Sequence, residues 1–334
     1  MKPRIVFMGS PECAVPSLRA AVGIGDVVGV FSQPDRPCGR GRKCLPPPVV
    51  QAALELGLAV HQPQKIRTPE LGRLLADLKP DAILVVAYGR ILPRSILDAA
   101  PCGCVNVHFS LLPRHRGAAP VAHAVLEGDA ETGVTLMVLD EGMDTGPLLV
   151  QCRTPLEPEE TAGELTERLA RLGAQMVVDD LPRYLAGELA PRPQPADGAT
   201  LARMLEKADG AIRWDRPAAE VHRRIRAVTP WPGAYGFLDG KRLLIHRARL
   251  LAHVPSPGPG AVRVEGKRIA VGTGEGCIEL LEVQRECCRR CDAAAFLAGC
   301  PPLAGAVVRP APGPAGEDAT CPATPSAGTT GRPG

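Results

Sequence analysis

The first half of the chain alternates short apolar runs with stretches whose apolar residues recur at helical spacing. A short apolar run fits a buried strand, and recurrence every three to four residues fits one face of a helix. Strands that alternate with helices predict an α/β fold built on a parallel, doubly wound sheet. The expected strands are 4–9, 26–32, 58–61, 81–87, 104–108 and 133–140, and the expected helices are 15–22, 49–56, 70–78 and 121–127.

A proline-rich stretch separates this half from a region with a different pattern. A long helix over 161–186, opened by a capping box of Thr161 and Glu164, is expected to close the first domain. A helix at 219–227 and several short strands follow, with a hairpin turn at Asp239-Gly240, which predicts a small β-barrel of the oligonucleotide-binding kind. We predict a first domain at 1–188, a linker at 189–205, a barrel domain at 206–309 and a disordered tail at 310–334.

Several classes of protein are excluded by what the sequence lacks. No apolar run reaches the ~18 residues of a membrane span, and the residues after Met1 look like a strand, not a signal peptide. The Gly9-Ser-Pro11 turn lacks the glycine spacing of a dinucleotide-binding loop, so a nicotinamide cofactor is not indicated. We expect a cytoplasmic enzyme without a membrane partner. Positive charge is concentrated in residues 206–310, which fits a polyanionic partner or an ordinary solvated surface.

The 12 cysteines are scattered through the chain, and without an export signal we expect no disulfide framework. The densest group is Cys287, Cys288 and Cys291, with Cys300 as a further thiol. One Cys-x-x-Cys pair is half of a structural zinc site, but no second pair follows. Zinc ligands and reduced thiols both remain open for these cysteines, and no metal is assigned to the functional site.

Three polar residues lie at or just after expected strand ends. Asn106 and His108 are two apart on one strand and therefore share a face, and Asp144 follows the strand at 133–140. In a parallel sheet, ligands bind beyond the carboxyl ends of the strands, so an amide, an imidazole and a carboxylate can converge there. This trio suits attack on a carbonyl group. His108 as a core histidine and Asp144 as a brace of its own turn remain the structural alternatives.

The motifs around these residues resemble the folate-dependent formyltransferases. The resemblance is carried by Asn106-Val-His108, Ser110-Leu-Leu-Pro113, Arg116-Gly-Ala-Ala-Pro120, Thr132-Gly-Val-Thr135 and Asp144-Thr-Gly146. Within that group, further motifs are similar to the methionyl-tRNA formyltransferases, and the resemblance covers about residues 3–308. These motifs are Gln33-Pro-Asp-Arg-Pro37, Gly39-Arg-Gly-Arg-Lys43, Val86-Ala-Tyr-Gly89, Trp214 after Gly210-Ala-Ile-Arg213, and Thr229-Pro-Trp-Pro-Gly233.

The resemblance implies a Rossmann-like, mostly parallel catalytic domain followed by an oligonucleotide-binding-like barrel. It implies transfer of a formyl group from 10-formyltetrahydrofolate, a co-substrate and not a bound cofactor, to the α-amino group of methionine on initiator tRNA. Asn106, His108 and Asp144 fall on the catalytic trio. The residues that fall on the folate site are Ser110, Leu111, Leu112, Pro113, Tyr88 and Gly89, and those on a tRNA-binding loop are Arg36, Arg40, Arg42 and Lys43.

The chemistry of these residues agrees with such roles. Protonated His108 and the Asn106 amide can donate to the oxyanion of the tetrahedral intermediate. Asp144 can keep His108 charged and take part in proton transfer from the amine. Leu111 and Leu112 can pack against the pterin. A mobile basic loop at 36–43 fits a phosphate backbone, although a solvated surface loop has the same composition.

Other functions share the same core motifs. A formyltransferase acting on a small amine, either glycinamide ribonucleotide or a nucleotide sugar, uses the same trio, and water as acceptor would give a formyltetrahydrofolate hydrolase. A non-catalytic tRNA-binding module is an alternative from a different class, which the intact trio disfavours. We expect the chain to act as a monomer.

Overall fold

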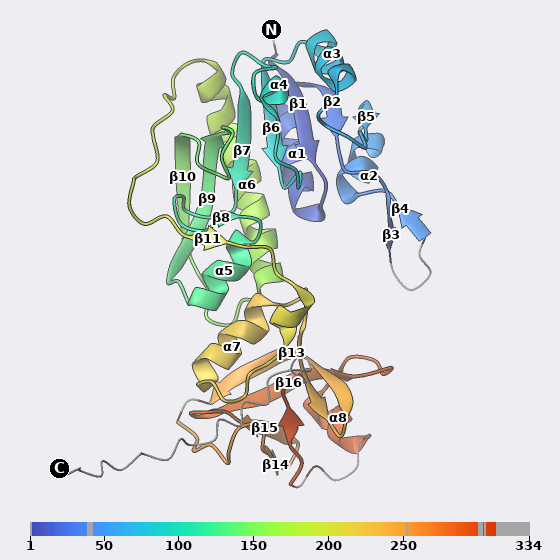
Figure 1. The fold of residues 1–334 in the computed structure, drawn as a ribbon, viewed down its shortest axis with the longest axis vertical. Helices are drawn as coiled ribbons and strands as arrows, with labels where there is room; N and C mark the ends of the chain where they lie inside the picture. Colours follow the sequence, from blue (N-terminus) through green and yellow to red (C-terminus); the bar gives the residue numbers. More distant parts are fainter. Residues whose placement is uncertain (1, 39–42, 252, 300–302, 304, 312–334) are drawn as a thin grey trace, which may run out of the picture.

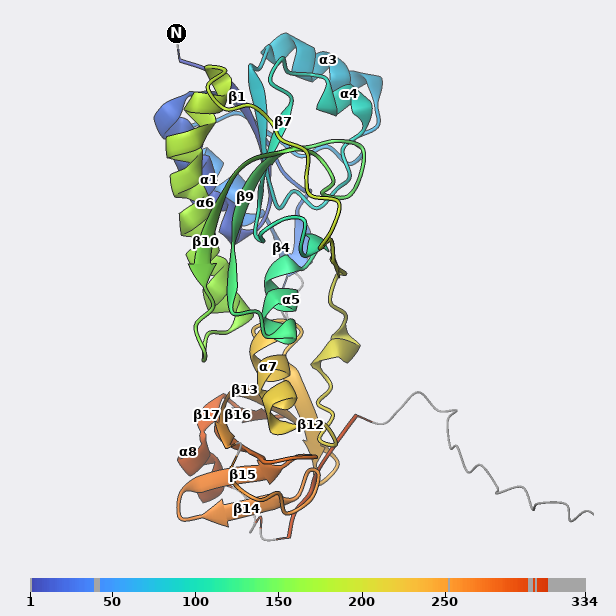
Figure 2. The same cartoon turned by 90° about the vertical axis from the view of Figure 1, so that its left-hand side faces the viewer.

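The structure, a computed structural model, describes residues 2–38, 43–251, 253–299, 303 and 305–311. Two sheets lie one above the other along the long axis of the molecule, with helix α7 (Ala218–Ala227) between them (Figure 1). Strands with helices on both faces form the upper part, and a curled antiparallel sheet forms the lower part (Figures 1 and 2). No helix in the described ranges combines the length and the apolar character needed to cross a membrane.

The first sheet has seven strands in the order β10-β9-β7-β6-β1-β2-β5, and its central strands run parallel. Its strands are β1 (Arg4–Gly9), β2 (Asp26–Phe31), β5 (Val60–His61), β6 (Ala82–Val86), β7 (Cys104–His108), β9 (Glu131–Val138) and β10 (Leu148–Pro155). The helices are α1 (Val15–Ile24), α2 (Pro48–Glu55), α3 (Pro69–Leu78), α4 (Arg94–Leu97), α5 (Pro120–Glu127) and α6 (Ala162–Leu185), with a short 3-10 helix at Glu12–Ala14. These elements confirm the predicted α/β fold, although β10 was not expected.

Both faces of this sheet are covered, as a doubly wound sheet requires. Side chains alternate along β1: Ile5 and Phe7 join the core under α1, α2 and α6, whereas Val6 and Met8 join a second core under α3 and α4. All four are essentially inaccessible to solvent. Thr161 caps α6 and forms the predicted capping box with Glu164.

The last two strands of the sheet reverse direction. Strand β9 is antiparallel to β7, so that Val138 pairs with Val105 and Thr135 pairs with His108. Strand β10 is antiparallel to β9 in turn. The carboxyl end of β9 therefore lies beside the start of β7, at the edge opposite His108. The expectation that Asp144 follows a strand end on the same edge as His108 was wrong, and another path brings the two together.

The second sheet confirms the predicted small barrel as an antiparallel sheet curled into a half-barrel. Its strand order is β14-β15-β16-β13-β12-β18, and two backbone hydrogen bonds, from Val262 to Ala306 and from Val308 to Gly260, join its edges. Asp239 and Gly240 adopt positive φ in the predicted hairpin turn. The elements are β12 (Ala234–Leu238), β13 (Lys241–Leu251), β14 (Val262–Glu265), β15 (Arg268–Gly272), β16 (Cys277–Arg285), β17 (Cys291–Asp292), α8 (Ala293–Ala298) and β18 (Val308–Arg309).

The segment that connects the two parts lies against the first part along much of its length (Figure 2). Arg192 exchanges two backbone hydrogen bonds with Leu148 at the start of β10. Strand β11 (Leu201–Ala202) then pairs in parallel with β8 (Arg116–Gly117). A 3-10 helix at Lys207–Gly210 follows. The predicted linker is thus a docked segment, while the predicted domain boundaries themselves stay predictions.

Candidate active site

Strand β7 presents Asn106 and His108 at the end of the sheet. Asn106 lies beside Val85 of β6, and its side-chain oxygen Oδ1 is buried without a hydrogen-bond partner among the described residues. Buried polar atoms are nearly always paired, so this unpaired amide at the strand end is available to a ligand or a water molecule. The amide can present its oxygen or its NH2 group to that ligand, because the two orientations differ only by a flip.

His108 is buried, and its ring is fixed by one main-chain contact. Nε2 lies 3.1 Å from the carbonyl oxygen of His115, which can only accept, so Nε2 carries a hydrogen. The other nitrogen, Nδ1, lies 3.8 Å from Oδ2 of Asp144. That separation is too long for a direct hydrogen bond. The nitrogen of His108 that remains free to accept a proton is therefore Nδ1, which faces the carboxylate.

Burial lowers the pKa of His108 below its ordinary value, although the Asp144 carboxylate and the His115 carbonyl both favour the protonated ring. A low-dielectric surrounding disfavours the imidazolium more than these two partners stabilise it. The free site therefore favours a neutral ring whose Nδ1 can accept a proton. This differs from the expected protonated donor, because the sequence cannot show how deeply the imidazole is buried.

The loop 139–147 carries Asp144 back from the far end of β9. Asp144 has φ +54, a conformation that non-glycine residues rarely adopt, and its Oδ2 accepts a 2.8 Å hydrogen bond from the Gly117 amide. Gly146 passes so close to β9 that a Cβ would lie 2.0 Å from the carbonyl oxygen of Val138. The return path thus explains both the glycine of the Asp144-Thr-Gly146 motif and the approach of the carboxylate to His108.

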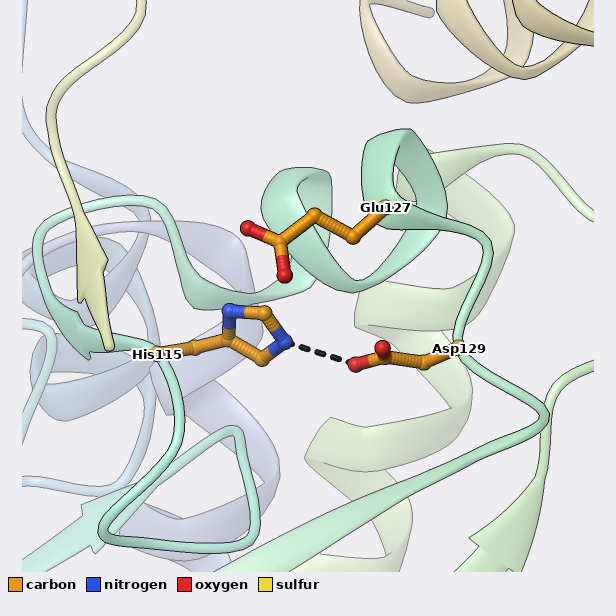
Figure 3. A group of neighbouring side chains, drawn as sticks. All are labelled: His115, Glu127 and Asp129. Atoms are coloured by element: carbon orange, nitrogen blue, oxygen red, sulfur yellow. Dashed lines mark hydrogen bonds and ion pairs between the residues drawn. The ribbon is translucent and has the colours of Figure 1, made fainter. Parts of the chain in front are cut away.

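His115 supplies the carbonyl that holds His108, and its own conformation is fixed by several groups. It has φ +59, its amide donates to Thr200 Oγ1 at 2.8 Å, and its ring nitrogen Nε2 lies 2.7 Å from Oδ2 of Asp129. The side chains of His115, Glu127 and Asp129 point toward one another (Figure 3). Neither His115 nor Asp129 was expected at the site. His115 contacts His108 through its main-chain carbonyl, which no sequence motif marks, and Asp129 contacts the ring of His115.

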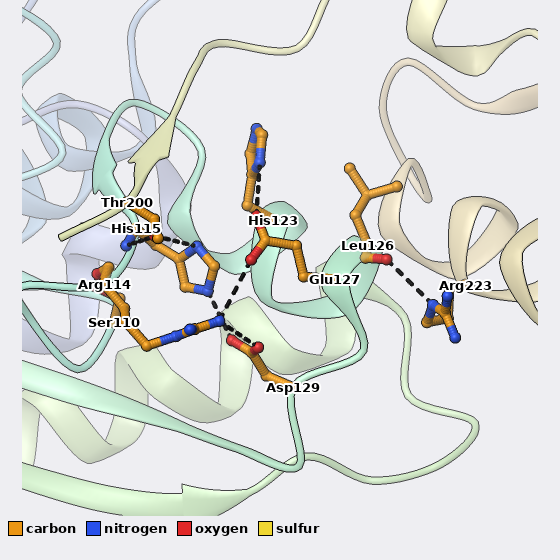
Figure 4. A network of polar contacts seen from close by, with 9 residues as sticks. All are labelled: Ser110, Arg114, His115, His123, Leu126, Glu127, Asp129, Thr200 and Arg223. Atoms are coloured by element: carbon orange, nitrogen blue, oxygen red, sulfur yellow. Dashed lines mark hydrogen bonds and ion pairs between the residues drawn. The ribbon is translucent and has the colours of Figure 1, made fainter. Parts of the chain in front are cut away.

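An arginine occupies the place where a metal ion could bind in this group. His115, Glu127 and Asp129 are close enough to share an ion, but Arg114 Nη2 lies 2.6 Å from Asp129 Oδ1 and 3.3 Å from Glu127 Oε2 (Figure 4). The guanidinium neutralises the carboxylates that would bind the metal. The group therefore fits a structural ion-pair cluster under the His115 turn.

The turn at 110–113 is held by hydrogen bonds to residues outside it. Ser110 is buried and donates to the Arg114 carbonyl, while Thr135 Oγ1 donates to the Ser110 carbonyl and accepts from the Leu112 amide. Gln151 donates to the Leu112 carbonyl at 2.8 Å. The Leu112 side chain is already buried in the protein, whereas Leu111 is partly exposed. Leu111, Leu112 and Pro113 line a cavity of about 480 Å³ whose walls do not include the trio.

Tyr88 and Gly89 follow β6 at the same edge as Asn106. Tyr88 is buried, which raises the pKa of its hydroxyl, and its carbonyl accepts a 3.0 Å hydrogen bond from Gln33 Nε2. Gly89 is exposed with φ +78, so the chain turns sharply outward there. Gln33 also accepts from Arg90 Nε, which ties this turn to the end of β2.

The basic loop and the cysteine group are described only in part. Arg36 and Lys43 lie in a short hairpin of β3 (Arg36–Cys38) and β4 (Lys43–Leu45), while Arg40 and Arg42 lie outside the described residues. The tRNA-binding role of this loop therefore stays a prediction. Cys287 and Cys288 are exposed, Cys291 is partly buried, and Cys300 is outside the described ranges, as are residues 312–334 of the predicted tail.

A buried imidazole beside a carboxylate, with a free amide two residues earlier, can move a proton while a carbonyl carbon is attacked. Fold and site together fit an enzyme that acts on a carbonyl group. The family model described as formyl transferase matches residues 4–181, and that of the formyl transferase C-terminal domain matches residues 204–301. The chain belongs to the formyl transferase family.

Curated relatives are similar over nearly the whole chain. The methionyl-tRNA formyltransferase of Myxococcus xanthus is 51% identical over 299 residues, covering 89% of this chain and 95% of the relative. That of Sorangium cellulosum is 47% identical over 308 residues, covering 91% and 99%. Among solved structures, an N-formyltransferase from Helicobacter canadensis, in complex with folinic acid and dTDP-3-aminofucose, superposes with a TM-score of 0.64 at 19% identity, covering 85% of this chain and 100% of that one. This structural likeness concerns the fold.

Proposed function

We propose that the chain transfers the formyl group of 10-formyltetrahydrofolate to the α-amino group of methionine on initiator methionyl-tRNA. Identity of about half to methionyl-tRNA formyltransferases, over almost their full length, carries this proposal. The excess of positive charge in the second matched domain supports it further, since such a surface suits a polyanionic acceptor better than a small amine. Folate is a co-substrate that enters and leaves in each cycle.

We assign the chemical step to Asn106, His108 and Asp144. The amine nitrogen attacks the formyl carbon, and the carbonyl electrons move to the oxygen, where the Asn106 amide donates a hydrogen bond. The proton released by the amine passes to Nδ1 of neutral His108, and Asp144 stabilises the imidazolium that forms. Collapse of the intermediate breaks the bond from the carbon to the folate nitrogen, which takes the proton from His108.

We assign the turn at 110–113, with Tyr88 and Gly89, to folate binding, and the loop 36–43 to the tRNA. Hydrogen bonds to Arg114 and Thr135 hold the turn at 110–113 in one conformation, which suits a surface that positions a ligand. We also propose that the enzyme acts as a monomer, because Asn106, His108 and Asp144 all come from one chain. Light scattering on the purified protein tests the monomeric state. We place its activity in the cytoplasm, where translation uses the charged initiator tRNA.

The test is a transfer assay with the full chain, 10-formyltetrahydrofolate and initiator tRNA charged with methionine. We expect formylmethionyl-tRNA to accumulate. Parallel reactions with glycinamide ribonucleotide, with an amino sugar nucleotide and without any acceptor measure the competing small-amine and hydrolase activities. Faster turnover of one of these reactions, with no product on tRNA, would contradict the proposal. Folate and tRNA binding without any turnover would instead support the non-catalytic module.

A further inference from the structure

The segment between the two domains reaches into the candidate site through the side chain of Gln194. Its Nε2 donates to the carbonyl of Asp144 and to the carbonyl of Gly146, each at 2.8 Å. Its Oε1 accepts from Arg116, at 3.1 Å from Nε and 2.6 Å from Nη2. Two carbonyls face one end of the amide and a guanidinium faces the other, so only one orientation of the amide satisfies all four contacts.

These contacts join the two stretches of chain that together place the Asp144 carboxylate. One stretch is the return loop, where Asp144 itself has positive φ and needs surrounding contacts to keep that conformation. The other stretch is β8, where the Gly117 amide donates to Asp144 Oδ2. Gly117 lies so close to β11 that a Cβ would come within 2.7 Å of the Ala202 carbonyl. The connecting segment thus contacts both stretches.

Gln194 is itself held in register by its neighbours in the segment. Two residues earlier, Arg192 exchanges backbone hydrogen bonds of 2.7 and 2.8 Å with Leu148, just after the return loop. Further along, Thr200 Oγ1 accepts from the His115 amide, and the Thr200 carbonyl accepts from the Arg116 amide. The Gln194 side chain is partly buried between these anchors, whereas its neighbours 195–199 are exposed. A single inward-facing amide in an otherwise exposed run indicates a specific role for that side chain.

We propose that Gln194 is a positioning residue for the formyl-transfer reaction, which fixes the distance and direction of the Asp144 carboxylate toward His108. The inference rests on the proposed function for its activity readout. Gln194 touches no reacting atom and acts through the main chain of Asp144 and Gly146. A shift of the carboxylate by about 1 Å is enough to cost about 100-fold in turnover.

The discriminating variant is Gln194→Glu, which keeps the length of the side chain and its acceptor toward Arg116. It replaces the donor with an oxygen that faces two carbonyls. We expect kcat to fall about 10- to 100-fold, with the KM values for tRNA and folate changed far less. Gln194→Met removes all four hydrogen bonds without adding charge and is measured beside it. Asp197→Ala, which truncates an exposed side chain of the same segment, is the matched control and should keep wild-type turnover.

A double-mutant cycle with Asp144→Asn separates positioning from a general loss of structure. If Gln194 acts through Asp144, the Gln194 variants should change kcat by less than about twofold in the Asp144→Asn background. Equal losses in both backgrounds, or full turnover of Gln194→Glu and Gln194→Met, would overturn the proposal. Melting temperatures of all variants identify a substitution that merely unfolds the protein. If one of the two Gln194 variants is unfolded, the result of the other one tests the proposal.

A second readout does not depend on turnover. The pKa of His108, followed by NMR of the imidazole, should move in the same direction in Gln194→Met, which adds no charge, as in Asp144→Asn, because each weakens the influence of the Asp144 carboxylate. An unchanged pKa in Gln194→Met would overturn the positioning role even in a chain that transfers no formyl group. An inactive wild-type chain in which this pKa does move would count against the proposed function alone.

Discussion

At the scale of single residues, the chemistry of the candidate site depends on which ring nitrogen of His108 carries a hydrogen. The His115 carbonyl fixes a hydrogen on Nε2, and burial keeps Nδ1 unprotonated in the free protein. Since burial lowers the pKa of His108 below 6.5, the unfolded chain binds the proton more readily than the folded one. The stability contributed by His108 is therefore complete above pH 6.5 and is lost as the pH falls through the folded pKa.

We predict that His108→Ala lowers kcat by about 100- to 10,000-fold and leaves the protein folded, since it removes the group that carries the proton.

Asp144→Asn should also lower kcat. It removes the carboxylate that favours the protonated ring, so the pKa of His108 should fall further and its limb of the pH profile should move to lower pH. Profiles of kcat against pH for wild type and Asp144→Asn provide the measurement. Coincident limbs would mean that Asp144 does not act on His108.

At the scale of elements, local patterns predicted most of the strands and helices. Helical periodicity and the Thr161 cap located α6, and short continuous apolar runs located the central strands. The direction of β9 could not be predicted, because pairing with β7 is a long-range choice that no local pattern encodes. The strand-end argument for Asp144 was therefore wrong, whereas the resemblance of the Asp144-Thr-Gly146 motif to the formyltransferases does not depend on it. Gln194 and the His115 carbonyl were missed, since each acts through main-chain contacts distant in sequence.

Two substitutions distinguish the contribution of the loop 139–147 to activity from the contribution of helix α6 to stability. Gly146→Ala places a Cβ against the Val138 carbonyl, so the loop must shift and kcat should fall at least tenfold, because a displacement of about 1 Å is costly. Thr161→Ala removes the cap of α6 and should lower the free energy of unfolding by about 1 kcal/mol while kcat stays constant. Denaturant titration and a transfer assay on both variants test this. Equal activity in the two would show that the path of the loop is unimportant.

At the scale of the whole molecule, the site and the expected tRNA surface belong to different regions. The trio comes from β7 and the loop 139–147 of the upper part, whereas most of the excess positive charge falls in residues 206–310, which form the curled lower sheet and helix α7. The hairpin of β3 and β4, at the ends of the predicted basic loop, belongs to the upper part (Figure 1). A polyanion that contacts both would need to extend along the long axis. A tRNA has that extension, whereas a nucleotide sugar does not.

Replacing Arg40 and Arg42 with Ala should raise the KM for charged tRNA and leave folate affinity nearly unchanged, since the proposed folate turn is at 110–113. Affinity for tRNA should fall with salt, and the slope should flatten by roughly one unit for each phosphate that the double variant no longer neutralises. The measurement is KM against salt for wild type and the double variant, with folate titration as the control. Identical salt slopes would show that the loop does not touch the tRNA backbone.

The docked connecting segment also has a consequence for how the enzyme is made. The Asp144 carboxylate receives one hydrogen bond from a residue 27 positions earlier and its main chain receives another from a residue 50 positions later. A ribosome delivers the chain from its amino terminus, and early domains fold while later ones are still being synthesised. The first sheet can thus form on the nascent chain before Gln194 has been added. The hydrogen bonds that position the Asp144 carboxylate are therefore completed late in synthesis, when the segment that leads to the second domain emerges.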